Sequence, residues 1–161
     1  MGLFSKKNKA LSADFSFVDG LEGFTKGLLV NITADDSNDK LVIKGKFSNT
    51  PEVNLKYEQI TGITCTTEKE IIEKSKSVVG RAAIGGVLLG PLGAIVGGMS
   101  GVGNKQQKKT SYYMIINYKS RDGETKVLSF EVTETIGSWD KLISHVRNKI
   151  NMGSREESIY L

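Results

Sequence analysis

The chain has 161 residues, about the length of one domain. Hydrophobic residues make up 39% and charged residues 25% of it, a balance that excludes a collagen-like, a wholly disordered and a polytopic membrane protein. The formal net charge is +4, and Cys65 is the only cysteine, so no disulfide can form within the chain. Because nothing in this composition requires an oxidising compartment, we expect a cytoplasmic protein.

Residues 1–14 are predicted to be a basic leader, with Lys6, Lys7 and Lys9 close together. The first residues come near a myristoylation signal, but Ser5 stands one position before the place where that signal has its hydroxyl. No apolar stretch follows the lysines, as it would in a secretory signal peptide. We therefore expect this end of the chain to stay on the cytoplasmic side.

Alternating apolar residues predict a run of antiparallel strands in the first half of the chain. A short first strand around Phe15 and Phe17 is followed by alternating stretches at residues 27–33 and 41–47, the second ending on Phe47. Turn-forming residues between them predict a hairpin. Residues 53–57 alternate again, and β-branched residues predict that a strand continues to about Ile72, with Glu68, Glu70 and Glu73 on its solvated face.

The end of the chain predicts one more hairpin and a helix. Residues 112–118 alternate with Tyr112, Met114, Ile116 and Tyr118 on one face, and Asp122-Gly123 is a hairpin-turn sequence before the return strand at 128–132. Apolar residues between Ile136 and Ile150 fall on one helical stripe, for which Ser138 is the expected N-cap. Residues 152–161 are predicted to be a flexible tail.

This order of strands, closed by one amphipathic helix, resembles the pleckstrin-homology (PH)-like superfold, in the version of bacterial PH-like and GRAM-like domains. The residues that carry the resemblance are 53–63, a strand followed by polar, aromatic and acidic residues, and 112–150, with Asp122-Gly123 and Trp139. It covers about residues 25–73 and 111–151. The resemblance implies an α+β domain over residues 15–151, an antiparallel β-barrel or sandwich closed by the C-terminal helix, with Trp139 in its core. It does not select a function, because such folds host many.

Between the two matched parts lies a glycine-rich window. Nine of the 18 glycines fall within residues 80–103, and residues 82–103 hold no charged side chain. Small residues recur there at every fourth position, a spacing that lets helix backbones approach closely; they form two sets, Ala82, Gly86, Gly90 and Gly93, Gly97, Gly101. Pro91 separates the sets and would break a helix. We therefore predict that residues 78–104 form an inserted helical hairpin, a glycine zipper.

Such a hairpin is predicted to need a partner, because its glycines disfavour a helix in isolation. Each arm of about nine residues would be roughly 14 Å long, enough to enter one leaflet of a membrane but not to cross it. The alternatives are self-association of a soluble protein and docking on the chain's own domain. The residues expected to contact the membrane or a second copy are Ala82, Gly86, Leu88, Leu89, Gly90, Pro91, Leu92, Gly93, Ile95, Gly97 and Gly101.

Basic residues surround the window. Between Glu73 and Asp122 the chain has no acidic residue in 48 positions. Lysine and arginine next to a membrane-inserted segment attract anionic headgroups. We therefore expect contact with an anionic surface, on the inner face of the membrane, from Lys74, Lys76, Arg81, Lys105, Lys108 and Lys109.

No arrangement of residues predicts catalysis. The glycines at 98–103 imitate a phosphate-binding loop, but Asn104 stands where that loop has its lysine. Cys65 is expected to be a small core residue, and the lone His145 a solvated helix residue. The tyrosines at 112, 113 and 118 could stack on single-stranded nucleic acid, but their alternation is that of a strand. We expect a non-enzymatic module without cofactor or metal, whose partner is a membrane lipid surface, or alternatively a second copy or another protein, and not nucleic acid.

Overall fold

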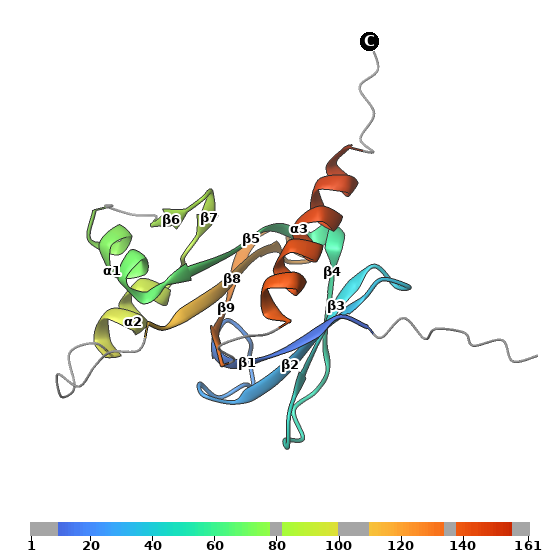
Figure 1. Cartoon of the computed structure of the whole chain (residues 1–161), viewed down its shortest axis with the longest axis horizontal. Coiled ribbons are helices and arrows are strands. Elements are labelled where there is room, and N and C mark those ends of the chain that lie inside the picture. The colour runs from blue at the N-terminus through green and yellow to red at the C-terminus, as the bar shows by residue number, and fades with distance from the viewer. Residues whose placement is uncertain (1–9, 78–81, 100–109, 134–137, 156–161) are drawn as a thin grey trace, which may run out of the picture.

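The computed structural model describes residues 10–77, 82–99, 110–133 and 138–155. Its main element is a seven-stranded antiparallel sheet in the order β4-β3-β2-β1-β9-β8-β5 (Figure 1). The strands are β1 (Ser12–Asp19), β2 (Leu29–Asp35), β3 (Lys40–Gly45), β4 (Val53–Lys56), β5 (Ile60–Thr67), β8 (Tyr112–Lys119) and β9 (Thr125–Val132). The predicted α+β class and the predicted hairpins β2–β3 and β8–β9 are confirmed.

The sheet is open, whereas a barrel or sandwich was predicted. Its two edges, β4 and β5, are consecutive in the chain and are separated by a 3-10 turn, η1 (Tyr57–Gln59). In that turn the Gln59 side chain accepts a hydrogen bond from the Lys56 amide (3.1 Å) and donates one to the Lys119 carbonyl (3.2 Å). The chain therefore turns away from β4 before β5 begins, and no ladder joins these two strands in the described residues.

One face of the sheet holds the main core. Side chains that alternate along the strands are buried there, among them Phe15, Ile32 and Phe130. The helix α3 (Trp139–Arg155) closes this core with Leu142 and Val146, as its apolar stripe predicts. The Ser138 carbonyl accepts the first helical bond, from the Leu142 amide (2.8 Å), but its hydroxyl donates to Ser12 O (2.6 Å) instead of capping α3.

Two domain boundaries differ from those predicted. Strand β1 begins at Ser12, inside the predicted leader of residues 1–14, and α3 continues to Arg155, inside the predicted tail of residues 152–161. Residues 1–9 and 156–161 lie outside the described residues. The ordered domain is therefore slightly longer at both ends than residues 15–151.

The opposite face of β5, β8 and β9 carries a second apolar cluster. The side chains of Tyr113 and Ile115 in β8 are buried on this face, while Met114 and Ile116 are buried on the other. The second cluster is covered by α1 (Glu68–Ser77), the two-residue strands β6 (Ala83–Ile84) and β7 (Val87–Leu88), and α2 (Leu92–Met99). Figure 1 shows these four elements gathered at one end of the molecule, away from β3 and β4. Strand β8 thus lies between two cores.

Residues 68–72 were predicted to continue a strand, but they form the first turns of α1. The hydroxyl of Thr67 accepts a hydrogen bond from the Glu70 amide (3.3 Å), which is an N-cap contact. Acidic residues in the first turn and Lys74 and Lys76 in the last turn both favour a helix through its dipole. The glutamates that alternate in the sequence therefore lie on a helix and not on a strand.

The predicted helical conformation of the first arm is also wrong, because residues 82–89 form a tight β-hairpin. Gly85 and Gly86 make its two-residue turn with φ angles of +58° and +79°. Two consecutive residues with positive φ are typical of hairpin turns and are incompatible with a right-handed helix. Ala82, Gly86 and Gly90 therefore do not form a ridge on one helix. The second arm is helical, over Leu92–Met99.

Candidate functional site

The glycine-rich segment, defined here as the described residues 82–99, lies on the outer face of the sheet. Its apolar side chains Val87, Leu89, Leu92 and Val96 are buried in the second cluster. The segment is therefore docked on its own domain, which was the third alternative considered for the glycine-rich window. Of the residues predicted to contact a membrane or a second copy, the structure buries Leu89 and Leu92, half-buries Ala82, Leu88, Gly93 and Ile95, and exposes Gly86, Gly90, Pro91 and Gly97.

The segment crosses the sheet along one row of neighbouring residues, which we call the Asn117 row: Gly62 in β5, Asn117 in β8 and Val127 in β9. A Cβ added to Gly62 would lie 3.0 Å from Val87 Cγ2, and one added to Gly90 would lie 3.1 Å from Val127 Cγ2. The four residues Val87-Leu88-Leu89-Gly90 therefore run across three strands in close contact with this row.

Asn117 forms the central contact of the row. Its side chain is 3% exposed, its Nδ2 donates to the Leu88 carbonyl (2.8 Å), and its Oδ1 accepts from the Leu88 amide (2.6 Å). The β6–β7 hairpin does not use the amide and the carbonyl of Leu88. Its hydrogen bonds are made by the neighbouring residues, for example from the Leu89 amide to the Ala82 carbonyl (2.9 Å). Asn117 was not among the predicted site residues, although an amide in the otherwise apolar run of β8 was a signal.

Helices α1 and α2 pack through one small residue of the predicted ridge. A Cβ added to Gly93 would lie 2.7 Å from Ser75 Cβ and closer still to its Oγ, whereas at Gly97 or Gly98 it would meet nothing within 4 Å. The Ser75 hydroxyl donates to the Ile71 carbonyl (2.7 Å) and so lies back along its own helix. Close helix packing through glycine is thus present, but it is intramolecular and depends on Gly93.

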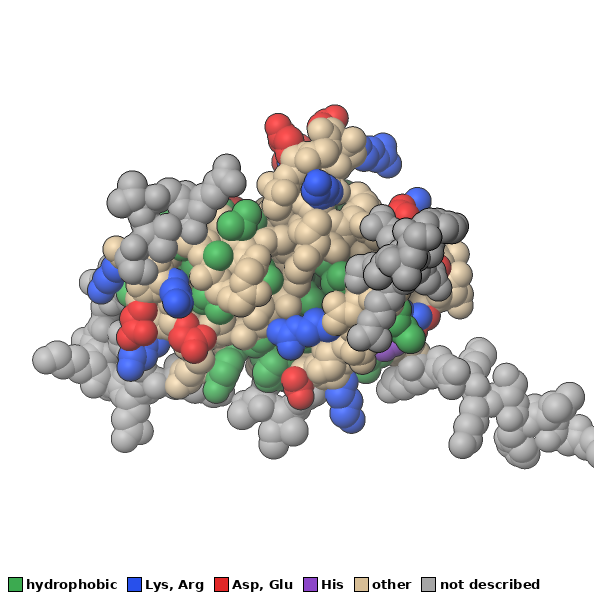
Figure 2. All heavy atoms as spheres, turned by 90° about the horizontal axis from the view of Figure 1, so that it is seen from above, with side chains coloured by type: hydrophobic (Ala, Val, Ile, Leu, Met, Phe, Trp, Pro, Cys, Tyr) green, Lys and Arg blue, Asp and Glu red, His purple; other side chains and the backbone are tan. Residues whose placement is uncertain are grey.

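The basic flank is described only at Lys74 and Lys76; Arg81, Lys105, Lys108, Lys109 and also Gly101 lie outside the described residues. Both lysines are exposed on α1. That helix has the sequence EKEIIEKSKS, so its three lysines are matched by three glutamates. Figure 2 shows acidic and basic side chains next to one another at the end of the molecule where α1 lies in Figure 1. The charge of α1 is therefore mixed.

Phe47 is the most exposed large apolar side chain of the described residues, at 96%. The alternating pattern placed it at the end of a strand, but β3 ends at Gly45, and Phe47 stands in the loop before β4 with φ +57°. The ammonium of Lys46 lies 5.9 Å from its ring centroid and 2.5 Å from Asp14 Oδ2. The turn formers that directly follow Phe47 were the signal that this position belongs to a loop.

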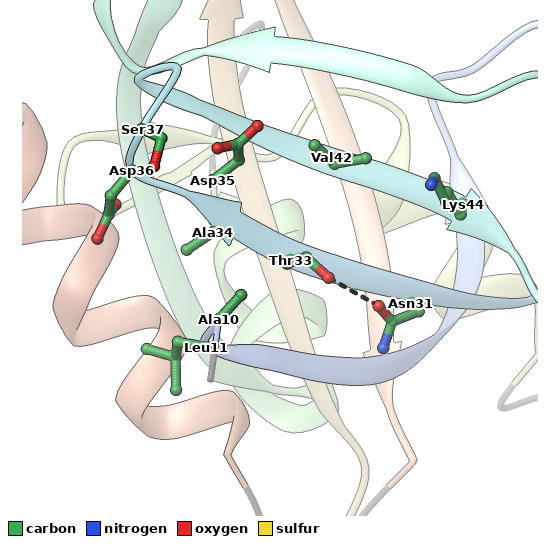
Figure 3. A pocket seen from close by; sticks show the side chains of 10 residues that line it. All are labelled: Ala10, Leu11, Asn31, Thr33, Ala34, Asp35, Asp36, Ser37, Val42 and Lys44. Atoms are coloured by element: carbon green, nitrogen blue, oxygen red, sulfur yellow. Dashed lines mark hydrogen bonds between the residues drawn. The ribbon is translucent and has the colours of Figure 1, made fainter. Parts of the chain in front are cut away.

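A hollow of about 660 Å³ lies on the outer face of β2 and β3 (Figure 3). Two of its polar side chains are bonded to each other, since the Thr33 hydroxyl donates to Asn31 Oδ1 (2.9 Å), and Asn31 Nδ2 also donates to Asp14 Oδ1 in β1 (2.7 Å). No group of three or more metal-ligating side chains lies together in the part of the chain that the structure describes. The hollow offers an open polar surface without an evident ligand site.

The single cysteine packs against the main core, and the single histidine has a polar partner. Burial raises the pKa of the half-buried Cys65 thiol to about 11, so the thiol stays protonated at neutral pH. His145 Nε2 lies 2.9 Å from Asp36 Oδ1, between α3 and the β2–β3 turn.

The three tyrosines considered for base stacking do not share a face. Tyr113 is buried under the glycine-rich segment, Tyr112 stands 6.2 Å from the Trp139 ring, and Tyr118 packs on the main core. They do not form one stacking platform.

A comparison with known protein families finds a match over the part of the chain that holds most of the sheet and the glycine-rich segment. The model of one protein family, described as "Glycine zipper containing PH domain", matches residues 22–131, about two thirds of the chain. No curated protein and no solved structure matches the chain. Within the described residues, the helices are all too short or too polar to span a membrane.

Proposed function

From the premise that the chain belongs to the family of glycine-zipper-containing PH domains, we propose that it is a non-enzymatic module that attaches peripherally to an anionic membrane surface. The attachment is made by the glycine-rich segment. In water the segment rests on the Asn117 row, and at a bilayer it moves into the outer part of one leaflet.

The observation that carries this proposal is that the segment itself contributes only apolar side chains and backbone groups to its contacts with the sheet. Residues 82–99 contain no charged side chain, and Val87, Leu89, Leu92 and Val96 are buried against the sheet. A protein core and the acyl chains of a lipid both exclude water, so moving these side chains from one to the other changes little hydrophobic free energy. Small additional terms, such as headgroup attraction, then decide where the segment lies.

The exposed loop before β4 gives a second reason to expect a membrane. An aromatic ring next to an ammonium group is typical of the membrane interface, where the ring lies among the headgroups and the charge stays in water. Phe47 is exposed beside Lys46, whose ammonium is also paired with Asp14, so this loop would contribute the apolar ring more than headgroup attraction. Lys74 and Lys76 add attraction of about 1 kcal/mol each near an anionic surface, which the glutamates of α1 reduce.

The test adds one charge to the segment without disturbing its docked form. Ala94 is exposed in the first turn of α2, where an aspartate is tolerated in water. A buried charge in a bilayer is unfavourable by about 2.5–3.5 kcal/mol at the centre of the membrane. We therefore expect Ala94→Asp to lower binding to phosphatidylserine-containing vesicles by tenfold or more in a co-sedimentation assay. Asn148→Asp, on the exposed side of α3, makes the same change in charge and should bind like the wild type.

Equal binding of both variants and the wild type would show that the segment does not enter the bilayer. Light scattering of the same proteins in detergent-free buffer examines self-association. An oligomer of the wild type that Ala94→Asp dissociates would identify the segment as a contact between copies instead.

A further inference from the structure

We propose that the Asn117 row is a docking site for one occupant, residues 87–90 of this chain. The hydrogen bonds of the Asn117 side chain set how often the glycine-rich segment is released, and we call this side chain the latch. The inference rests on the proposed function, because it concerns the regulation of that same segment.

The row and its occupant match at three successive points. Gly62 leaves room for Val87, the Asn117 amide pairs with the backbone of Leu88, and Gly90 leaves room for Val127. A Cβ added at either glycine would lie 3.0–3.1 Å from the facing valine Cγ2, so that valine would have to shift. A generic apolar cover would not need a glycine in the contact at each end of the row, Gly62 in the row itself at one end and Gly90 in the segment at the other. The fit is specific to this short sequence in this register.

The Asn117 contact makes docking an all-or-none event. A buried amide that makes both of its hydrogen bonds is favourable, whereas one that loses a single partner carries an unsatisfied polar group. A segment displaced by a residue along the row would break both bonds to Leu88 and keep Asn117 buried. The favourable alternatives are therefore the docked register and a fully released segment, in which water reaches the amide.

Release has a further consequence for the sheet. It uncovers Tyr113 and Ile115, which are 3% and 0% exposed in the docked form. In water this exposure opposes release. At a bilayer, the released apolar side chains of the segment contact lipid instead of water, so release is less unfavourable there than in solution.

The test is Asn117→Asp in the full chain. The carboxylate keeps the shape of the amide and one acceptor for the Leu88 amide, but it cannot donate to the Leu88 carbonyl, and it is disfavoured while buried. We expect hydrogen exchange of the amides in residues 82–99 to become on the order of tenfold faster, and binding to phosphatidylserine-containing vesicles to rise. The matched control is Asn54→Asp, on the exposed side of the edge strand β4, which should change neither.

A second variant keeps the test independent of the sheet. Leu88→Pro removes the donor to Asn117 Oδ1 from the segment and leaves every residue of the seven strands in place. Trp139 fluorescence, which reports on the main core, checks that both variants are folded. Unchanged exchange of residues 82–99 in both folded variants overturns the latch. Faster exchange without vesicle binding by any of the proteins supports the latch and overturns the proposed membrane function instead.

Discussion

Replacing Gly93 by alanine tests whether the glycine-rich segment is held by close packing of α2 on α1. Alanine is favoured over glycine in a helix by about 1 kcal/mol, so the substitution would stabilise α2 if nothing else changed. At Gly93, however, the added Cβ would lie 2.7 Å from Ser75 Cβ, and a rotation of the hydroxyl alone cannot relieve that contact. Overpacking of this kind is unfavourable by about 1–3 kcal/mol.

Gly98→Ala is the matched control, because Gly98 lies as near to one end of α2 as Gly93 does to the other, and its Cβ would meet nothing within 4 Å. The difference between the two variants removes the shared gain in helix propensity. We expect Gly93→Ala to dock less stably than Gly98→Ala by about 1–3 kcal/mol, measured by hydrogen exchange of the α2 amides. Adding Ser75→Gly should recover most of that difference. Equal protection of α2 in both single variants would refute the packing argument.

Three further predictions concern single positions. Burial acts to raise the pKa of the Asp36 carboxyl, but hydrogen bonds from His145 and Tyr57 outweigh it and the pKa is lowered. A lowered pKa in the folded state stabilises the fold at pH values above the pKa of the unfolded chain, about 3.9. The free energy of unfolding of Asp36→Asn in urea should therefore be about 0.2–1 kcal/mol lower than that of the wild type at pH 7. This difference between the two proteins should vanish as the pH falls through the folded-state pKa. Phe47→Gly should leave the free energy of unfolding unchanged or raise it by about 1 kcal/mol in a thermal unfolding experiment, because glycine relieves the positive φ and no buried side chain is lost. Vesicle binding of this variant should fall. The Cys65 thiol, with its pKa raised by burial to about 11 from an ordinary value of 9.0, should react with a disulfide reagent about 100-fold more slowly in the folded than in the unfolded protein near pH 7.5.

Much of the sheet could be predicted from the sequence because its main core follows simple alternation. Strands β2, β3 and β8 bury every second residue on one face, and the stripe of α3 marks the surface that covers them. The position of the glycine-rich window between β5 and β8 was also evident, since its composition differs from that of the flanking strands.

The conformation of the window was harder to predict, because it depends on the sheet. Small residues at every fourth position are compatible with a helix, and Gly85-Gly86 is equally compatible with a hairpin turn. The hairpin is chosen because it presents the backbone of Leu88 to Asn117, a contact that no local pattern contains. In the same way, Phe47 extends an alternating pattern past the end of β3 because alternation alone does not mark where pairing with a neighbouring strand stops.

The two-sided burial of β8 bears on how related sequences should vary. In a sheet whose outer face met water, positions 113, 115 and 117 would be free to carry polar or charged residues, while 114 and 116 would stay apolar. Here the outer positions contact the segment that lies on them, so we expect Tyr113, Ile115 and Asn117 to vary together with residues 87–90. Relatives without the glycine-rich segment should have lost all three together, and those that have it should change Asn117 only when residues 87–90 change as well.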